Sequence, residues 1–283
     1  MLPQVLYEGL VMGLIYALLA MGIALIWGVC GILSFCQGEF MLIAMYMTYG
    51  LYEYCGLDPI QSIPIVMVAM FFVGVLVFKT IIKQAMKGPV LVQRLVTFAL
   101  SLVIINGVLM TIGSRVRSIT NLMLSGNINL GIISVSYQKL VPMAVSVLVT
   151  VFLFLFLNKT QTGMAIRATS QDKEAAGLMG INTERMQTLA FAVSSAIAGA
   201  AGCALTYFYF VSPTVSSPFQ IFGFMAVCIG GLGSIGGAFL GGLLVGIVDL
   251  LGGTYLSVAY KYVIIAVMYL AVVSIKPQGI FKR

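Results

Sequence analysis

Long apolar tracts, separated by short polar stretches, make up most of this chain. They cover residues 5–29, 40–54, 60–79, 92–113, 139–157, 187–211, 220–251 and 259–275. Most are close to the roughly 20 residues with which a helix crosses a bilayer. Lipid offers the backbone no hydrogen-bond partners, so a membrane-spanning chain must form helices or a closed β-barrel. The tracts lack the regular alternation of apolar and polar residues that barrel strands show, so we expect helices. The pattern predicts an all-α polytopic membrane protein of about eight transmembrane segments, with one transmembrane domain over residues 1–283.

The seventh tract is too long and too rich in glycine for one straight helix. The sequence GGLGSIGG fills Gly230 to Gly237, and glycine destabilises a helix interior. We therefore expect this tract to break into two half-helices or a re-entrant hairpin. Broken helices at membrane depth can line a transport pathway. The pathway candidates in this turn are Gly231, Gly233, Ser234 and Gly236.

The same glycines spell GxGxxG, the fingerprint of a dinucleotide site. That fingerprint needs a strand before it and an acidic residue about 20 positions later. Here the neighbouring segments are apolar, and Asp249 follows Gly236 by only 13 residues. We reject the nucleotide interpretation and prefer glycines that let helices approach closely.

Polar residues also interrupt the apolar sequence between the first two tracts, in LSFCQGEF (Leu33 to Phe40). A carboxylate at bilayer depth costs about 2.5 to 3.5 kcal/mol on insertion scales, so Glu39 is a functional candidate. The alternative is that Glu39 only occupies the first turn of the second span, where the helix dipole favours it. The further pathway candidates in this stretch are Ser34, Gln37, Gly38 and Glu39.

Charged residues make up 8% of the chain, against 61% hydrophobic residues, and the net charge is +7. The basic residues are scattered between the apolar tracts, which favours the positive-inside rule and membrane lipid over a nucleic-acid partner. Eleven of them fall on one side of the predicted topology: Lys79, Lys83, Lys87, Arg94, Lys159, Arg167, Lys173, Arg185, Lys276, Lys282 and Arg283. Arg115, Arg117, Lys139 and Lys261 fall on the other. We predict that the first group faces the cytoplasm, with the N-terminus and the loop 116–138 outside.

Candidate catalytic chemistry is sparse. The chain has no histidine, its five cysteines form no CxxC pair, and no GxxxxGK[ST] loop is present. Those residue types would be needed for a metal site, a nucleophilic triad or a nucleotide site. We expect neither an enzyme nor a cofactor-binding chain, so any energy source must come from another subunit.

The most polar segment is the 19-residue stretch from Arg167 to Arg185, inside a predicted cytoplasmic loop at 158–186. Ser170 is a candidate N-cap and Gly180 a candidate C-cap, which predicts a helix over residues 171–179. Asn182 or Thr183 can then cap the sixth span. So short a helix is marginal alone and needs something to dock against. The alternative is a capped surface helix on the membrane. The residues that could couple this segment to a soluble partner subunit are Ser170, Asp172, Glu174, Ala175, Ala176, Leu178, Met179 and Gly180.

Three blocks of the sequence resemble a known family. Glu174-Ala175-Ala176, followed after three residues by Gly180, is similar to the EAA loop that ABC importer permeases insert into their ATPase subunits. With GLVMGLIYALLAMGIALIWGVCGILSFCQGEF and FMAVCIGGLGSIGGAFLGGLLVGI, it resembles the branched-chain amino-acid ABC transporter permeases of the LivH type. One difference is Gln37, which stands where many relatives have the histidine of NFAHG and argues against a protonation role there.

The resemblance implies a bacterial inner-membrane permease with a set of separate partners. These are a related second permease, two cytoplasmic ATPase subunits that use the ATP, and an extracytoplasmic substrate-binding protein. It predicts an importer of branched-chain or other hydrophobic amino acids. The alternatives are a permease for urea, a short amide or a sugar, and a self-sufficient secondary transporter or channel.

Overall fold

The computed structural model describes residues 2–119, 126–129, 134–255, 258–276 and 279–281. Apart from one short hairpin and one isolated bridge between Arg117 and Val211, the described secondary structure is helical. The first half of the chain forms α1 (Leu2–Cys30), α2 (Gln37–Cys55), α3 (Pro59–Val77), the π-helical turn η1 (Phe78–Ile82), α4 (Lys83–Ala85) and α5 (Val90–Ile112).

The hairpin lies between α5 and the second half of the chain. Strands β1 (Asn127–Asn129) and β2 (Ser134–Ser136) pair antiparallel, with Ile128 opposite Val135. The remaining helices are α6 (Tyr137–Lys159), α7 (Gln161–Gln171), α8 (Lys173–Leu178), α9 (Thr183–Leu205), α10 (Ser216–Gly230), α11 (Ile235–Tyr255) and α12 (Val258–Ile275).

Six helical stretches in the described part of the chain are long and apolar enough to cross a membrane. They are Leu2–Cys30, Pro59–Ala85, Val90–Ile112, Tyr137–Lys159, Thr183–Leu205 and Ile235–Tyr255. Ser216–Gly230 and Tyr260–Ile275 are apolar but shorter. The protein is therefore a multi-pass helical membrane protein. By length and composition, the structure supports six of the roughly eight spans that the sequence predicts.

The glycine-rich tract is divided unequally. α10 ends at Gly230 and α11 begins at Ile235, so the break lies within the glycine-rich stretch. α11 has 21 residues and is by itself long enough to span, whereas α10 has only 15.

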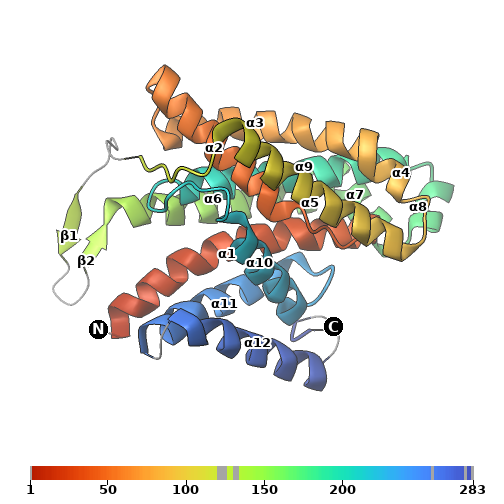
Figure 1. Cartoon of the computed structure of the whole chain (residues 1–283). Helices are drawn as coiled ribbons and strands as arrows, with labels where there is room; N and C mark the ends of the chain where they lie inside the picture. The colour runs from red at the N-terminus through yellow and green to blue at the C-terminus, as the bar shows by residue number, and fades with distance from the viewer. Residues whose placement is uncertain (1, 120–125, 130–133, 256–257, 277–278, 282–283) are drawn as a thin grey trace.

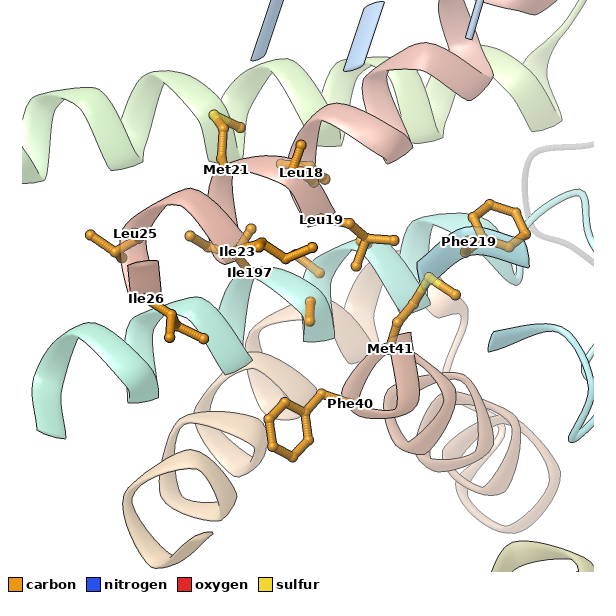
Figure 2. Close-up of a cluster of buried hydrophobic side chains, with 14 of the residues drawn as sticks. Leu18, Leu19, Met21, Ile23, Leu25, Ile26, Phe40, Met41, Ile197 and Phe219 are labelled. Atoms are coloured by element: carbon orange, nitrogen blue, oxygen red, sulfur yellow. The ribbon is translucent and has the colours of Figure 1, made fainter. Parts of the chain in front are cut away.

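The centre of the molecule is α1, which lies against α11, α9, α10 and α6. In the most apolar 18-residue stretch of α1, 89% of the residues are buried, and the buried share of the corresponding stretch of α9 is also 89%. Figure 2 shows the cluster around it, where Leu19 and Ile23 of α1 point toward Met41 of α2, Ile197 of α9 and Phe219 of α10. At the periphery, only 11% of the corresponding stretch of α5 is buried.

Small residues let α1 and α11 pack backbone against backbone. A Cβ atom on Gly246 would lie 2.1 Å from the Cα of Gly13, and one on Gly242 would lie 2.3 Å from the Cα of Ala17. Lipid chains are as apolar as leucine, so close van der Waals contact holds membrane helices together. The close contacts fall on Gly242 and Gly246 and not on the GxGxxG glycines, since a Cβ on Gly233 or Gly236 would have its nearest neighbour at 3.6 Å or 3.9 Å.

The molecule has two distinct ends. The N-terminus and the β1–β2 hairpin lie at one end, on the left in Figure 1, and α4 and α8 lie at the other, on the right. An ion pair of 2.5 Å joins Glu8 to Lys139 at the hairpin end, and another of 2.5 Å joins Lys83 to Glu184 at the α8 end. Among the predicted cytoplasmic cations, Lys83 belongs to α4 and Lys173 to α8, which lie at this end, and Lys282 and Arg283 are outside the described residues.

Candidate functional site

A buried polar cluster surrounds the start of α2. Residues 31–36 leave α1 without helical structure, and Ser34 and Gln37 are fully buried where this segment joins α2. Glu39, in the first turn of α2, is 2% exposed. Irregular backbone at membrane depth is tolerated where it is enclosed by protein or lines a cavity. The structure therefore brings Ser34, Gln37, Gly38 and Glu39 together inside the bundle.

Gln37 is held against α9 and α1. Its Nε2 atom donates hydrogen bonds to the carbonyl oxygen of Ser194, at 2.7 Å, and to the Ser194 hydroxyl, at 2.8 Å. Gly22 provides the space, because a Cβ there would lie 2.7 Å from the same nitrogen. The Oε1 atom of Gln37 is buried, and nothing in the described part of the chain donates a hydrogen bond to it.

Gln220 of α10 fixes the first turn of α2. Its Oε1 atom accepts from the backbone N–H of Gly38 at 2.5 Å, and its Nε2 atom donates to the carbonyl oxygen of Ser34 at 3.3 Å. A Cβ on Gly38 would lie 2.8 Å from the carbonyl oxygen of Ser216. Sequence reasoning missed Gln220. Its signal was a lone amide at the start of the apolar tract 220–251.

Glu39 points away from Gln37, toward α5 and α10. The hydroxyl groups of Ser101 and Ser216 lie beside its carboxyl group. Its Oε2 atom and the Ser216 hydroxyl are both buried, and neither has a hydrogen-bond partner among the described residues. Leaving such a group unsatisfied costs about 1 to 3 kcal/mol. Glu39 is in the helix-dipole position, as the alternative predicts, but the unpartnered oxygens also mark a place that a donor group could fill.

The connection between α9 and α10 is anchored to other loops. Tyr207 donates a hydrogen bond of 2.5 Å to Asp58, and Val211 forms the backbone bridge with Arg117. Burial and the Asp58 carboxylate raise the pKa of Tyr207, so the phenol keeps its proton and continues to donate. These contacts hold the segment that leads into α10, where Ser216 lies beside Glu39 and Gln220 contacts Gly38 and Ser34.

The glycine turn lies elsewhere. Gly231 and Gly233 have positive φ angles of 109° and 85°, and the Ser234 hydroxyl accepts from the Gly237 N–H at 3.1 Å, which caps α11. A Cβ on Gly236 would lie 3.9 Å from the Phe154 ring. At 1.5 Å per residue, α10 separates this turn from Ser216 by about 22 Å. The two groups of pathway candidates therefore do not form one site.

The Arg167–Arg185 segment contains the end of α7, the whole of α8 and the first turn of α9. The predicted helix over 171–179 forms, but it is shorter, Lys173–Leu178, and its N-cap differs from the predicted one. Asp172 is extended, and its side chain caps α8 by accepting from the N–H groups of Glu174, at 2.9 Å, and Ala175, at 3.0 Å. Ser170 is not an N-cap, because it lies in the last turn of α7 and donates to the Arg167 carbonyl oxygen at 2.7 Å. An aspartate two positions later satisfies the first amides of the helix instead.

The other predicted caps are confirmed. Gly180 has a φ of +84°; its N–H donates to Gly177 at 3.0 Å, and that of Ile181 donates to Ala176 at 3.1 Å. This pattern is a Schellman motif. Asn182 caps α9 by accepting from the Arg185 N–H at 3.0 Å. α8 and α9 are therefore joined by a short, fully capped turn.

The tip of α8 carries two bare hydrophobic side chains. Leu178 is 89% exposed and Met179 is 83% exposed. Asp172, Glu174, Ala175 and Gly180 are exposed as well, whereas Ala176 is buried and faces the body of the protein. Ala176 was one of the small and apolar side chains expected to contact a partner. Because it is buried within this chain, it cannot make that contact.

Asp249 is a second buried charged residue, and the sequence did not identify its partners. Asp249 of α11 is 2% exposed; its Oδ1 atom pairs with Lys261 of α12 at 3.1 Å, and its Oδ2 atom accepts from the Tyr16 hydroxyl of α1 at 3.0 Å. The Lys261 ammonium also lies 5.3 Å from the centre of the Tyr262 ring. The sequence marked Asp249 as a partner or cap residue, and the structure identifies Lys261 and Tyr16 as its partners.

Residues 5–273 match the family described as "Branched-chain amino acid transport system / permease component". No solved structure matches the chain. The chain is 29% identical to the high-affinity branched-chain amino acid transport system permease protein BraD of Pseudomonas aeruginosa, and 30% identical to LivH of Escherichia coli. Each alignment covers 99% of this chain and 95% of the relative.

A partial likeness reaches beyond these permeases. Over 143 residues the chain is 35% identical to the fructose import permease protein FrcC of Rhizobium meliloti, which covers 47% of this chain and 39% of that protein. The family match, by contrast, covers nearly the whole sequence. The chain therefore belongs to the family of branched-chain amino acid transport system permease components.

Proposed function

We propose that the chain is the transmembrane permease subunit of an ATP-binding-cassette importer for branched-chain or other hydrophobic amino acids. The observation that carries this proposal is the family match over residues 5–273, with relatives named for that transport over nearly their whole length. The partners are a related second permease, two cytoplasmic ATPases and an extracytoplasmic binding protein. ATP is used by those ATPases, and this chain needs no cofactor of its own.

Its place is the bacterial inner membrane, as one transmembrane domain with the N-terminus outside and the C-terminus in the cytoplasm. The α8 end then faces the cytoplasm, and residues 158–186, which hold α7 and α8, are the cytoplasmic segment. In the eight-segment count, α10 and α11 together are one tract. The chain enters it from the external side, reverses direction at the glycine turn and returns to the external side. This arrangement agrees with the positive-inside rule.

The exposed tip of α8 is the element on which an ATPase would act. Burying Leu178 and Met179 in a partner groove would contribute on the order of 1.5 to 3 kcal/mol each. Only four residues, 179–182, separate α8 from α9, so a push on α8 moves α9. On α9, Ser194 holds Gln37. In this proposal the movement of α9 therefore reaches the buried polar cluster, which lines the transport pathway. The glycine turn forms the cytoplasmic end of that pathway.

The coupling role is tested with the double variant Glu174→Lys/Leu178→Lys and with Gly180→Pro in the complete transporter. We expect both to insert normally, to leave ATP hydrolysis measurable and to reduce uptake at least about tenfold, because docking loses an apolar anchor or its cap. Gln84→Lys, an exposed change at the same end, is the matched control. Uptake at the wild-type rate in both variants would remove the coupling assignment.

A sugar is the second candidate cargo, because FrcC is similar over 47% of the chain. The two cargoes are compared by supplying the complete transporter with its own binding protein and measuring uptake of labelled leucine and fructose side by side. Fructose uptake without leucine uptake would replace the amino-acid assignment.

A self-sufficient transporter or channel makes a different prediction. The purified chain alone, in liposomes under an ion gradient, would then move solute without any ATPase. Absence of flux under those conditions, together with ATP-dependent uptake by the complete assembly, supports the importer.

A further inference from the structure

An open cleft of about 500 Å³ lies at the α8 end of the molecule. It is formed where the last turns of α1, α6 and α7 meet the glycine turn. Its lining residues are Trp27, Gly28, Phe154, Leu157, Asn158, Arg167, Ser170, Gln171, Leu232, Gly233 and Ile235. The cleft lies about the length of α10 away from the buried polar cluster, so it is a separate site.

The chemistry of the cleft is asymmetric. One guanidinium group, that of Arg167, faces it, and the Asn158 side-chain oxygen accepts from that group at 2.5 Å. An arginine held this way still has N–H groups free to donate to an anion. Ser170 and Gln171 add a hydroxyl and an amide beside it. No carboxylate is among the described residues that line the cleft.

The opposite part of the cleft is apolar. Trp27, Phe154, Leu157, Leu232 and Ile235 supply this surface. A cleft with one basic group beside an apolar wall fits a small ligand that has a carboxylate at one end and a short aliphatic chain at the other. Because none of the described lining residues is acidic and could pair with an ammonium group, the carboxylate is the charged group that this cleft selects.

Any occupant would touch two separate parts of the chain at once, α7 and the glycine turn. Arg167, Ser170 and Gln171 are in the last turns of α7, directly before the cap of α8. Leu232 and Gly233 belong to the turn that leads into α11. At the floor, a Cβ on Gly28 would lie 3.8 Å from both Ser170 and Gly233, so the two parts are already close.

We propose that this cleft binds a small aliphatic carboxylate from the cytoplasm and, when occupied, holds α7 and the glycine turn together and slows import. The regulatory part of the proposal rests on the proposed function, because it takes the α8 end as cytoplasmic and α8 as the coupling element. The ligand class includes the imported amino acid itself and the 2-oxo acid of the same carbon skeleton.

The binding step can be tested on the full chain alone, because Trp27 is its only tryptophan. In phosphatidylcholine nanodiscs, we expect leucine and 4-methyl-2-oxopentanoate to shift the Trp27 emission saturably, and leucinamide, which lacks the carboxylate, to leave it unchanged. Arg167→Gln should weaken the binding of both acids at least about tenfold. Lys159→Gln removes an exposed cation outside the cleft and should change nothing.

Three results would overturn the binding site. They are no saturable shift with either acid, an equal shift with leucinamide, and a shift that Arg167→Gln does not weaken. A lipid headgroup is the rival anion. If phosphatidylglycerol nanodiscs alone shift the emission through Arg167 and neither acid competes, the cleft is a lipid site and the proposal fails.

The regulatory step is tested in vesicles that contain the complete transporter, loaded inside with either acid or with leucinamide. Initial ATP-driven uptake should fall as the internal acid rises, with at least about a tenfold higher half-inhibitory concentration in Arg167→Gln, each variant being compared with its own unloaded rate. Inhibition that is equal in Arg167→Gln and wild type would overturn the regulation. Uptake into unloaded vesicles tests the proposed function separately, so the two failures are distinguishable.

Discussion

At the scale of single residues, two buried carboxylates have opposite surroundings. Asp249 faces the Lys261 ammonium, which balances its charge, and its Oδ2 atom accepts a hydrogen bond from the Tyr16 hydroxyl. Glu39 is equally buried, but no ion pair joins it to a basic side chain in the described part of the chain, and the hydroxyls of Ser101 and Ser216 lie beside its carboxyl group. A buried charge without a counter-ion is costly. The burial of Asp249 therefore has a counter-ion that accounts for it, whereas Glu39 remains the candidate for the proposed role in the pathway.

We predict that Glu39→Gln preserves the fold and reduces uptake at least about tenfold. The amide has nearly the same shape and removes the cost of a buried charge, so thermal stability should be unchanged or higher. Initial uptake by the complete transporter and the melting temperature of the purified chain are the two measurements. Glu53→Gln, an exposed change in the same helix, is the control. Full uptake by Glu39→Gln would leave only the helix-dipole role.

At the scale of elements, apolar composition does not determine where a helix lies. The most apolar 18-residue stretches of α1 and α5 have nearly equal mean hydropathy, 2.4 and 2.3. Yet 89% of the residues in the α1 stretch are buried, and only 11% of those in the α5 stretch. The difference follows the small residues. α1 carries Gly9 and Gly13 against α11, whereas Gly107 of α5 has open space around it. Close backbone approach, not hydropathy, places α1 at the centre.

We predict that Gly246→Ala destabilises the protein. Its new Cβ would lie 2.1 Å from the Cα of Gly13, so α1 and α11 must separate, and overpacking of this kind costs about 1 to 3 kcal/mol. Thermal unfolding in detergent measures the effect. Gly50→Ala in α2 is the matched control, because nothing lies within 4 Å of the added atom, and it should be neutral or slightly stabilising. Equal melting temperatures for the two variants would argue against the close α1–α11 contact.

At the scale of the whole molecule, charge and exposed apolar surface divide the protein into two different ends. The α8 end gathers most of the basic residues, the exposed Leu178 and Met179, and the cleft at Trp27. The hairpin end carries Tyr54 and Cys55, which are exposed in the last turn of α2. An importer needs this polarity, because its ATPases and its binding protein act on opposite sides of the membrane.

We predict that Cys55 faces outside. It is the exposed cysteine of the five, while Cys36 and Cys203 are buried and Cys30 and Cys228 are partly buried. A membrane-impermeant maleimide should therefore label the chain in spheroplasts but not in sealed inverted vesicles, and Cys55→Ser should abolish the labelling. Labelling confined to inverted vesicles would reverse the proposed orientation and place α8 outside the reach of any cytoplasmic ATPase.

The sequence by itself determined what depends on neighbours within a few positions. The apolar tracts became helices because lipid forces the backbone to satisfy itself. The caps at Gly180 and Asn182 formed because their partners are at most five residues away. Even locally, however, the competition between Ser170 and Asp172 for the cap of α8 was settled by backbone geometry that the residue types did not specify.

Tertiary structure alone decided which distant groups meet. Gln220 holds Gly38 across 182 residues, Lys261 finds Asp249 on another helix, and the glycine turn lies beside Trp27 rather than beside Glu39. Apolar periodicity gives no signal for these pairings, because every apolar face is satisfied equally well by lipid or by protein. Only the fit of glycine surfaces and single buried polar groups selects one arrangement, and that fit exists only in three dimensions.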